Sequence, residues 1–138
     1  MKLKIALIIL IVILVAIQFI PVDKTNPTVT AELDAPLEIR SVFKTSCYDC
    51  HSNETVWPWY SNIAPVSWLV AGDVNDARAH LNFSEWENLS RKDRVKMKEE
   101  IWEEIEDEKM PLWKYNILHP DASLKQKDKD LIRDWAGE

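Results

Sequence analysis

The sequence predicts an all-helical protein in which one N-terminal membrane helix precedes a single small helical domain. Three observations favour this class. An almost unbroken apolar run opens the chain, later apolar residues recur at helical spacing, and no segment alternates apolar and polar residues as a half-buried strand does. The length of 138 residues suits one domain rather than two.

The first element is the apolar run at residues 5–20, which only Gln18 interrupts. With its flanks, the run approaches the roughly 20 residues that a helix needs to cross a bilayer. A cleavable signal peptide also has a basic start, but its apolar part is about 7–15 residues long and ends at a small-x-small site. The residues after Ala16 offer no such site, so we expect residues 1–22 to form an uncleaved signal anchor.

The charge pattern gives the orientation and the class of partner. Lys2 and Lys4 are the only charged residues before Asp23, so the net charge of −6 for the whole chain becomes −8 beyond the apolar run. Basic flanks stay in the cytoplasm, which predicts a single-pass membrane protein with its domain on the extracytoplasmic side. Nucleic acid requires a basic surface, so this charge argues against it as a partner, whereas partners with basic patches fit an acidic domain.

The domain begins after a short polar segment. Residues 23–34 contain Pro27 and are expected to form a linker, with residues 35–138 forming the domain. From Pro36 the apolar residues fall on neighbouring helical turns, which predicts a first domain helix that ends just before Cys47.

Three more helices are expected farther along the chain. A helix over residues 65–80 begins at a proline, which suits the first helical position. A Ser-x-x-Asp pattern at residues 90–93 predicts the start of a third helix that runs to about residue 108. A Ser-x-x-Gln pattern at residues 123–126 predicts the cap of the last helix.

The chemistry centres on Cys47 and Cys50, which His51 follows directly. Two thiols with two residues between them can each add to one vinyl group of a haem, and the next imidazole then reaches the iron, so C-x-x-C-H predicts a c-type haem attachment site. A structural disulfide would not call for the histidine. A thioredoxin-like pair needs a βαβ context, and a zinc site needs four ligands, for which no second cysteine or histidine pair exists. We expect one covalent haem c, with His51 as an axial iron ligand.

The second axial ligand has four candidates. Met110 precedes a proline, so its backbone is expected to be extended in a loop that can bring the thioether over the other haem face. His80 at a helix end and His119 in a loop are the alternatives, and Met97 is expected to be an ordinary helix residue. Met110 is the predicted ligand, because His/Met ligation is a known cytochrome c arrangement.

The motifs resemble those of known families. A helix before C-x-x-C-H, a later Met-Pro and a closing amphipathic helix with Trp135 are similar to the small monohaem cytochromes c, although the first helix lacks their usual glycine. The segments CYDCHSNETVWPWYSNIAP and MPLWKYNILHPDASL more closely resemble a family of bacterial haem-binding domain proteins, often membrane-anchored. The resemblance covers about residues 36–135 and implies haem binding.

Further roles follow from this interpretation. Aromatic residues Trp57, Trp59 and Tyr60 are expected either to cover a haem edge or to fill the core away from it. Tyr115, His119 and Arg78 are candidates for bonds to a haem propionate. Electron transfer between extracytoplasmic partners is the leading functional hypothesis, and a haem-based sensor with a displaceable sixth ligand is the alternative. An enzyme of peroxidase type is not expected, because no distal acid–base arrangement is evident.

Overall fold

The computed structural model describes residues 1–137, and all regular secondary structure in them is helical. The α-helices are α1 (Lys2–Ala16), α2 (Leu37–Ser46), α3 (Tyr48–His51), α4 (Val66–His80), α5 (Arg91–Glu106), α6 (Trp113–Leu118) and α7 (Gln126–Ala136). Short 3₁₀ turns occur at η1 (Ile17–Phe19), η2 (Trp59–Asn62), η3 (Phe83–Asn88) and η4 (Pro120–Ala122). The expected all-helical class with an N-terminal apolar helix is confirmed.

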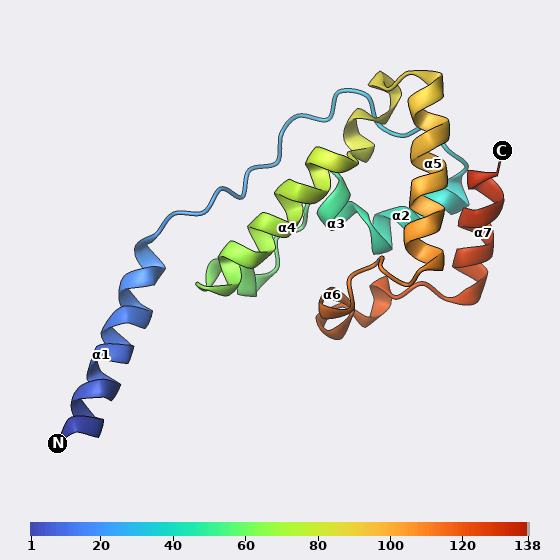
Figure 1. Ribbon diagram of the computed structural model, residues 1–138. Coiled ribbons are helices and arrows are strands. Elements are labelled where there is room, and N and C mark those ends of the chain that lie inside the picture. Colours follow the sequence, from blue (N-terminus) through green and yellow to red (C-terminus); the bar gives the residue numbers. More distant parts are fainter. Residues whose placement is uncertain (138) are drawn as a thin grey trace.

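The α1 helix projects away from the rest of the molecule (Figure 1). With η1 it forms an apolar stretch of 18 residues, Lys2–Phe19, none of which is buried. Its length and composition suffice to cross a membrane.

The segment after α1 is bound along the domain instead of running free. Leu33 is 2% exposed and belongs to the core, and its N–H donates to the Phe83 carbonyl at 2.9 Å. The Arg78 guanidinium of α4 donates to the Thr25 carbonyl and the Asn26 side chain, each at 2.8 Å. The residues expected to form a linker are therefore attached to the surface of the domain at several points.

The core lies where α2, α5 and α7 meet. Phe43 of α2 is fully buried, stacks on Phe83 with ring centroids 4.8 Å apart, and meets Trp135 of α7 edge-on at 5.3 Å. Ile101 and Ile105 of α5 are buried in the same cluster. The crossing of the first and last domain helices is closed by aromatic rings, whose large area makes them strong contributors to a small core.

Helix ends follow local capping chemistry. Ser90 accepts a hydrogen bond from the Asp93 N–H at 3.2 Å, so α5 begins where the sequence predicts. The expected cap at Ser123 is wrong. The Asp128 carboxylate accepts from the Lys125 N–H at 3.0 Å, and α7 begins only at Gln126.

The C-terminus of α5 is a Schellman turn. The helix ends at Glu106, and Glu108 adopts the left-handed conformation with φ 58°. The Glu108 N–H donates to the Ile105 carbonyl at 3.2 Å and the Lys109 N–H to Glu104 at 2.9 Å. After this turn the chain leaves the end of α5 sideways toward α6, as Figure 1 shows, and Tyr115 of α6 reaches Asp49 of α3.

Candidate functional site

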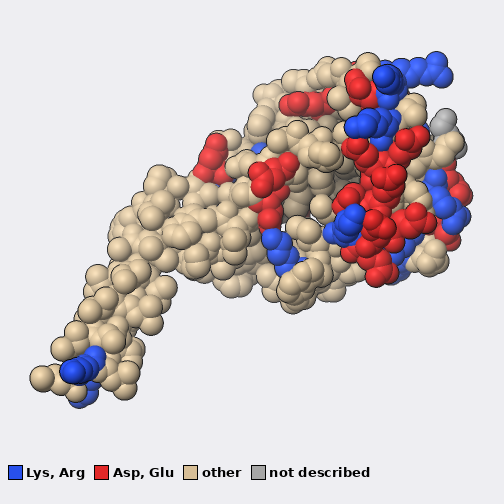
Figure 2. Space-filling model, in the orientation of Figure 1, with Lys and Arg blue, Asp and Glu red and all other residues tan. Residues whose placement is uncertain are grey.

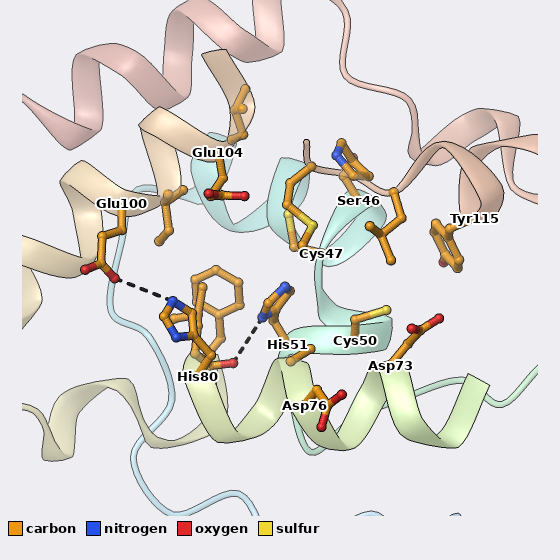
Figure 3. A pocket seen from close by; sticks show the side chains of 18 of the residues that line it. Ser46, Cys47, Cys50, His51, Asp73, Asp76, His80, Glu100, Glu104 and Tyr115 are labelled. Atoms are coloured by element: carbon orange, nitrogen blue, oxygen red, sulfur yellow. Dashed lines mark hydrogen bonds and ion pairs between the residues drawn. The ribbon is translucent and has the colours of Figure 1, made fainter. Parts of the chain in front are cut away.

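A cavity of about 430 Å³ lies between α3, α4, α5 and the segment 110–115. Its size falls within the roughly 300–1,000 Å³ that small-molecule and cofactor sites occupy. Figure 3 shows the labelled residues of its wall, with Cys47 and Cys50 near His51 and with acidic side chains from α4 and α5 at the rim. Apolar side chains of the core, including Phe83, Ile101 and Ile105, close its inner end.

One helical turn presents the two thiols and the imidazole together. The α2 helix ends at Ser46, and α3 is a single turn in which the His51 N–H donates to the Cys47 carbonyl at 2.8 Å. Cys47, Cys50 and His51 all line the cavity, so the short spacing in sequence becomes one continuous wall.

The orientation of His51 is fixed by a backbone carbonyl. Its Nδ1 lies 3.1 Å from the Leu81 oxygen, which follows the end of α4, so Nδ1 carries the proton and donates it there. Burial lowers the pKa of His51, which keeps the imidazole neutral. Nε2 is then left with its lone pair, and this pattern of one donating and one free nitrogen is typical of metal-binding histidines.

The two thiols are free and lie in an apolar setting. Burial raises the pKa of Cys47 to about 12 and that of Cys50 to about 11. Redox-active C-x-x-C pairs have the opposite property, since their reactivity requires a lowered thiol pKa.

The candidates for a second iron ligand differ in whether they line the cavity. Met110, His80 and Met97 line the cavity, although Met97 was expected to be an ordinary helix residue. His80 is largely exposed, and its Nε2 lies 3.5 Å from a Glu100 carboxylate oxygen. His119 lies outside the cavity lining and is engaged elsewhere.

A network of polar and aromatic contacts, which we call the clamp, joins the loop segments beside the cavity. The Tyr115 hydroxyl donates to the Asp49 carboxylate at 2.6 Å, and the Tyr115 ring stacks on His119 with centroids 4.2 Å apart. His119 Nε2 lies 2.8 Å from the Tyr60 hydroxyl. Burial, followed by the bond to Asp49, raises the pKa of Tyr115. The clamp fixes the segment carrying Met110 relative to the turn carrying the cysteines.

Sequence reasoning missed Asp49 and assigned other roles to its partners. The signal was present, because all four clamp residues belong to the two motif segments that carry the family resemblance. Of the residues suggested for propionate binding, only Tyr115 lines the cavity. Arg78 instead donates to the Ser52 carbonyl and the Thr55 hydroxyl, each at 2.7 Å.

The aromatic residues after the cysteines do not line the cavity, so they lie away from the place where they were expected to cover a haem edge. Trp57, Trp59 and Tyr60 are absent from the cavity lining within residues 1–137, and Trp59 is 75% exposed. Tyr60 acts through the clamp.

Taken together, these side chains define a site for a cofactor that is large, mostly apolar and able to bind an imidazole. The chain matches the haem-binding domain family over residues 12–138 and belongs to that family. It therefore binds haem. Searches among curated proteins and among solved structures each found no match.

The cavity fits haem by its chemistry. A neutral imidazole with a free Nε2 is a suitable iron ligand, a thioether stands in the same lining, and the apolar inner end suits a porphyrin. The two free thiols lie beside this imidazole in the same wall.

Proposed function

We propose that this protein is a membrane-anchored c-type cytochrome that carries single electrons between extracytoplasmic partners. The observation that supports the proposal most is the His51–Leu81 hydrogen bond. It prepares an iron ligand in the residue that directly follows the second thiol, within the wall of one cavity. Haem, when bound, supplies a one-electron Fe(III)/Fe(II) couple.

The thiols of Cys47 and Cys50 would make the covalent attachment. Each S–H adds across one vinyl C=C group, so sulfur bonds to one carbon, hydrogen to the other, and no group leaves. Because burial disfavours both thiolates in the folded chain, we expect attachment to take place before the domain closes around the site.

Met110 is the proposed second iron ligand. The Schellman turn and the clamp hold its segment at the cavity from both sides. His/Met ligation raises the reduction potential relative to other ligand sets and occupies both axial positions, which suits electron passage and excludes substrates. His80 and Met97 are the competing ligands, since both line the same cavity.

The anchor would place the domain on the periplasmic side of a bacterial inner membrane. The α1 helix has the length and composition for one crossing, and Lys2 and Lys4 favour a cytoplasmic N-terminus. A tether keeps the domain near membrane-bound partners and raises its effective concentration there.

A pyridine haemochrome assay tests the covalent link. The full chain is produced together with haem-ligating machinery, extracted with acidified acetone, and compared with the variant Cys47→Ala/Cys50→Ala. We expect haem to remain with the wild-type polypeptide and to be extracted from the variant. Equal retention by both proteins would refute the thioether bonds.

Methionine variants test the ligand. An oxidised His/Met haem has a weak far-red absorption band that arises from the iron–sulfur bond. We expect Met110→Leu to lose this band and Met97→Leu, the matched control from the same cavity, to keep it. Loss in the Met97 variant alone would assign the bond to Met97, and absence of the band from the wild type would exclude methionine ligation.

The sensor alternative makes a different prediction for the reduced protein. A displaceable sixth ligand gives rapid binding of carbon monoxide, whereas a firmly held Met110 gives slow or negligible binding. Rapid binding by the wild type, at the rate of Met110→Leu, would favour a sensor.

A further inference from the structure

An uncharged apolar surface lies beside the end of the membrane helix. Residues 55–72 contain no Asp, Glu, Lys, Arg or His. Within and beside this stretch, six exposed apolar side chains form what we call the apolar edge, namely Trp59, Ile63, Val66, Leu69, Trp113 and Ile117. Trp59 and Trp113 are about three-quarters exposed, at 75% and 74%.

The two parts of the apolar edge are neighbours in space. Trp59 packs edge-on against Tyr60 at 5.8 Å, and Tyr60 bonds to His119, which follows α6. Lys114 of α6 pairs with Asp73 of α4 at 2.7 Å. These contacts hold η2, the first turns of α4, and α6 on one side of the domain, as Figure 1 shows.

The anchor ends at this same place. The Gln18 amide of η1 donates to the Ala64 carbonyl at 3.1 Å and accepts from the Ala64 N–H at 3.0 Å. Lys24 also bonds to the side chain of Asn62. The loop before α4 is therefore attached to the end of the helix that would leave the bilayer.

The charged side chains of the domain gather on the part that lies far from the anchor. Figure 2 shows an uncharged surface that continues from α1 onto the adjoining part of the domain, while acidic and basic side chains gather over the far part, around α5. A domain hanging freely from a flexible tether would not require its uncharged side to face the anchor. An exposed aromatic and aliphatic patch of this kind marks an interaction surface.

We infer that the apolar edge lies in the interfacial layer of the same bilayer that α1 crosses, so that the haem domain is held in one orientation on the membrane. Tryptophan is favoured at this depth because its ring is apolar and its N–H is polar. The inference depends on the proposed membrane anchoring and haem binding. Because the apolar edge carries no charge of its own, its seating requires lipid but not anionic lipid.

Electron paramagnetic resonance of oriented bilayers tests the inference. The full, haem-loaded chain is placed in stacked phosphatidylcholine bilayers, and the signal of the oxidised haem iron is recorded as the stack is turned in the magnetic field. We expect a strong dependence on angle in the wild type. We expect Trp59→Ser/Trp113→Ser/Ile117→Ser to remain in the membrane but to lose most of this dependence.

The matched control substitutes exposed apolar residues outside the apolar edge. Leu37→Ser/Val95→Ser changes side chains that are 72% and 51% exposed and is expected to keep the oriented signal. An isotropic wild-type signal, or equal loss in the control, would overturn the inference. Loss of orientation on dilution of the protein with lipid would also overturn the inference, because it would show that a second copy of the chain, and not lipid, covers the apolar edge.

Separate outcomes distinguish a failure of this inference from a failure of the membrane anchoring or of the haem binding on which it depends. A chain that fails to sediment with phosphatidylcholine vesicles disproves anchoring, and a chain without an iron signal has bound no haem. In a haem-free chain the apolar edge is tested by brominated lipids, which should quench tryptophan fluorescence less in Trp59→Ser/Trp113→Ser than in the wild type. Equal quenching would again contradict the seating.

Discussion

At the scale of single residues, the imidazole of His51 is oriented by a main-chain oxygen that lies far from it in the sequence. The spacing of the two cysteines and the histidine is local, so the sequence indicates that these three residues act together. The acceptor that fixes the imidazole is the main-chain oxygen of Leu81, 30 residues away. Any residue carries such an oxygen, so no side-chain pattern could identify it. The end of α4 supplies it, since the chain leaves the helix after His80.

The contacts of the clamp were also not predictable from the sequence, because they join residues that are even farther apart. Asp49 and Tyr115 are separated by 66 positions and meet because the chain turns toward α3 after α5. Their residue types allow many pairings, so spacing alone could not select this one. The sequence favoured Met110 over His119 as a ligand, and in the structure Met110 lines the cavity while His119 is bound by Tyr60.

Tyr115→Phe is expected to weaken both the fold and the proposed bond between Met110 and the haem iron. The substitution removes a hydrogen bond to a carboxylate, which is worth about 1.5 kcal/mol of unfolding free energy. The far-red band should also decrease, because the segment that carries Met110 loses a fixed point. Tyr48→Phe is the control, since its hydroxyl bonds to Glu32 at 3.3 Å away from this segment. An unchanged band in Tyr115→Phe would refute the positioning role.

Thiol reactivity provides a prediction on pH. In the haem-free chain, pKa values of about 12 for Cys47 and about 11 for Cys50 leave little thiolate at pH 8, whereas an unfolded cysteine with a pKa of about 8.5 is partly ionised. Alkylation by iodoacetamide, followed by mass spectrometry, should be more than tenfold slower in buffer than in urea. The rate in buffer should continue to rise above pH 10, where that of the unfolded chain levels off. Equal rates at pH 8 would show that the pKa values of the two thiols are not raised.

At the level of elements, the starts of helices with local caps were predictable from the sequence. Which face of a helix the other elements cover was not. The proline at residue 65 and the serine at residue 90 predict the starts of α4 and α5 because their effects act within one turn. The start of α7 was missed because Asp128 offered a competing cap. Apolar spacing in α4 predicts a helix correctly, but Val66 and Leu69 are exposed, since periodicity does not reveal what covers a face.

The Schellman turn after α5 contains a residue poorly suited to its conformation. Glu108 has φ 58°, a region that costs most residues about 1 kcal/mol and glycine almost nothing. We expect Glu108→Gly to raise the unfolding free energy by about 1 kcal/mol in urea denaturation. Glu108→Ala, which also removes the ion pair with Lys129 but keeps a side chain, should change it little. A less stable glycine variant would contradict this account of the turn.

At the scale of the whole molecule, the acidic excess is concentrated around α5. The net charge of −6 was known from composition, but its placement required the fold. Glu100 and Glu104 lie on α5 and also line the cavity. Figure 2 shows acidic side chains gathered over the part of the domain that is far from α1. With the apolar edge on the membrane, the acidic side would face partners in the periplasm.

This arrangement predicts how small oxidants react with the reduced protein. A cationic oxidant such as tris(1,10-phenanthroline)cobalt(III) should react faster at low ionic strength, because the acidic rim raises its local concentration, while anionic ferricyanide should react faster as salt is added. Stopped-flow rates between about 10 mM and 1 M salt, over which the Debye length falls from roughly 30 to 3 Å, measure both dependences.

The variant Glu100→Gln/Glu104→Gln should flatten both salt dependences. The control Glu38→Gln/Asp134→Asn removes the same charge outside the cavity wall and should leave them nearly unchanged, since only charges close to the cavity act strongly at these distances. If both double variants behaved alike, net charge alone would govern the encounter, and electrons would not have to enter beside α5.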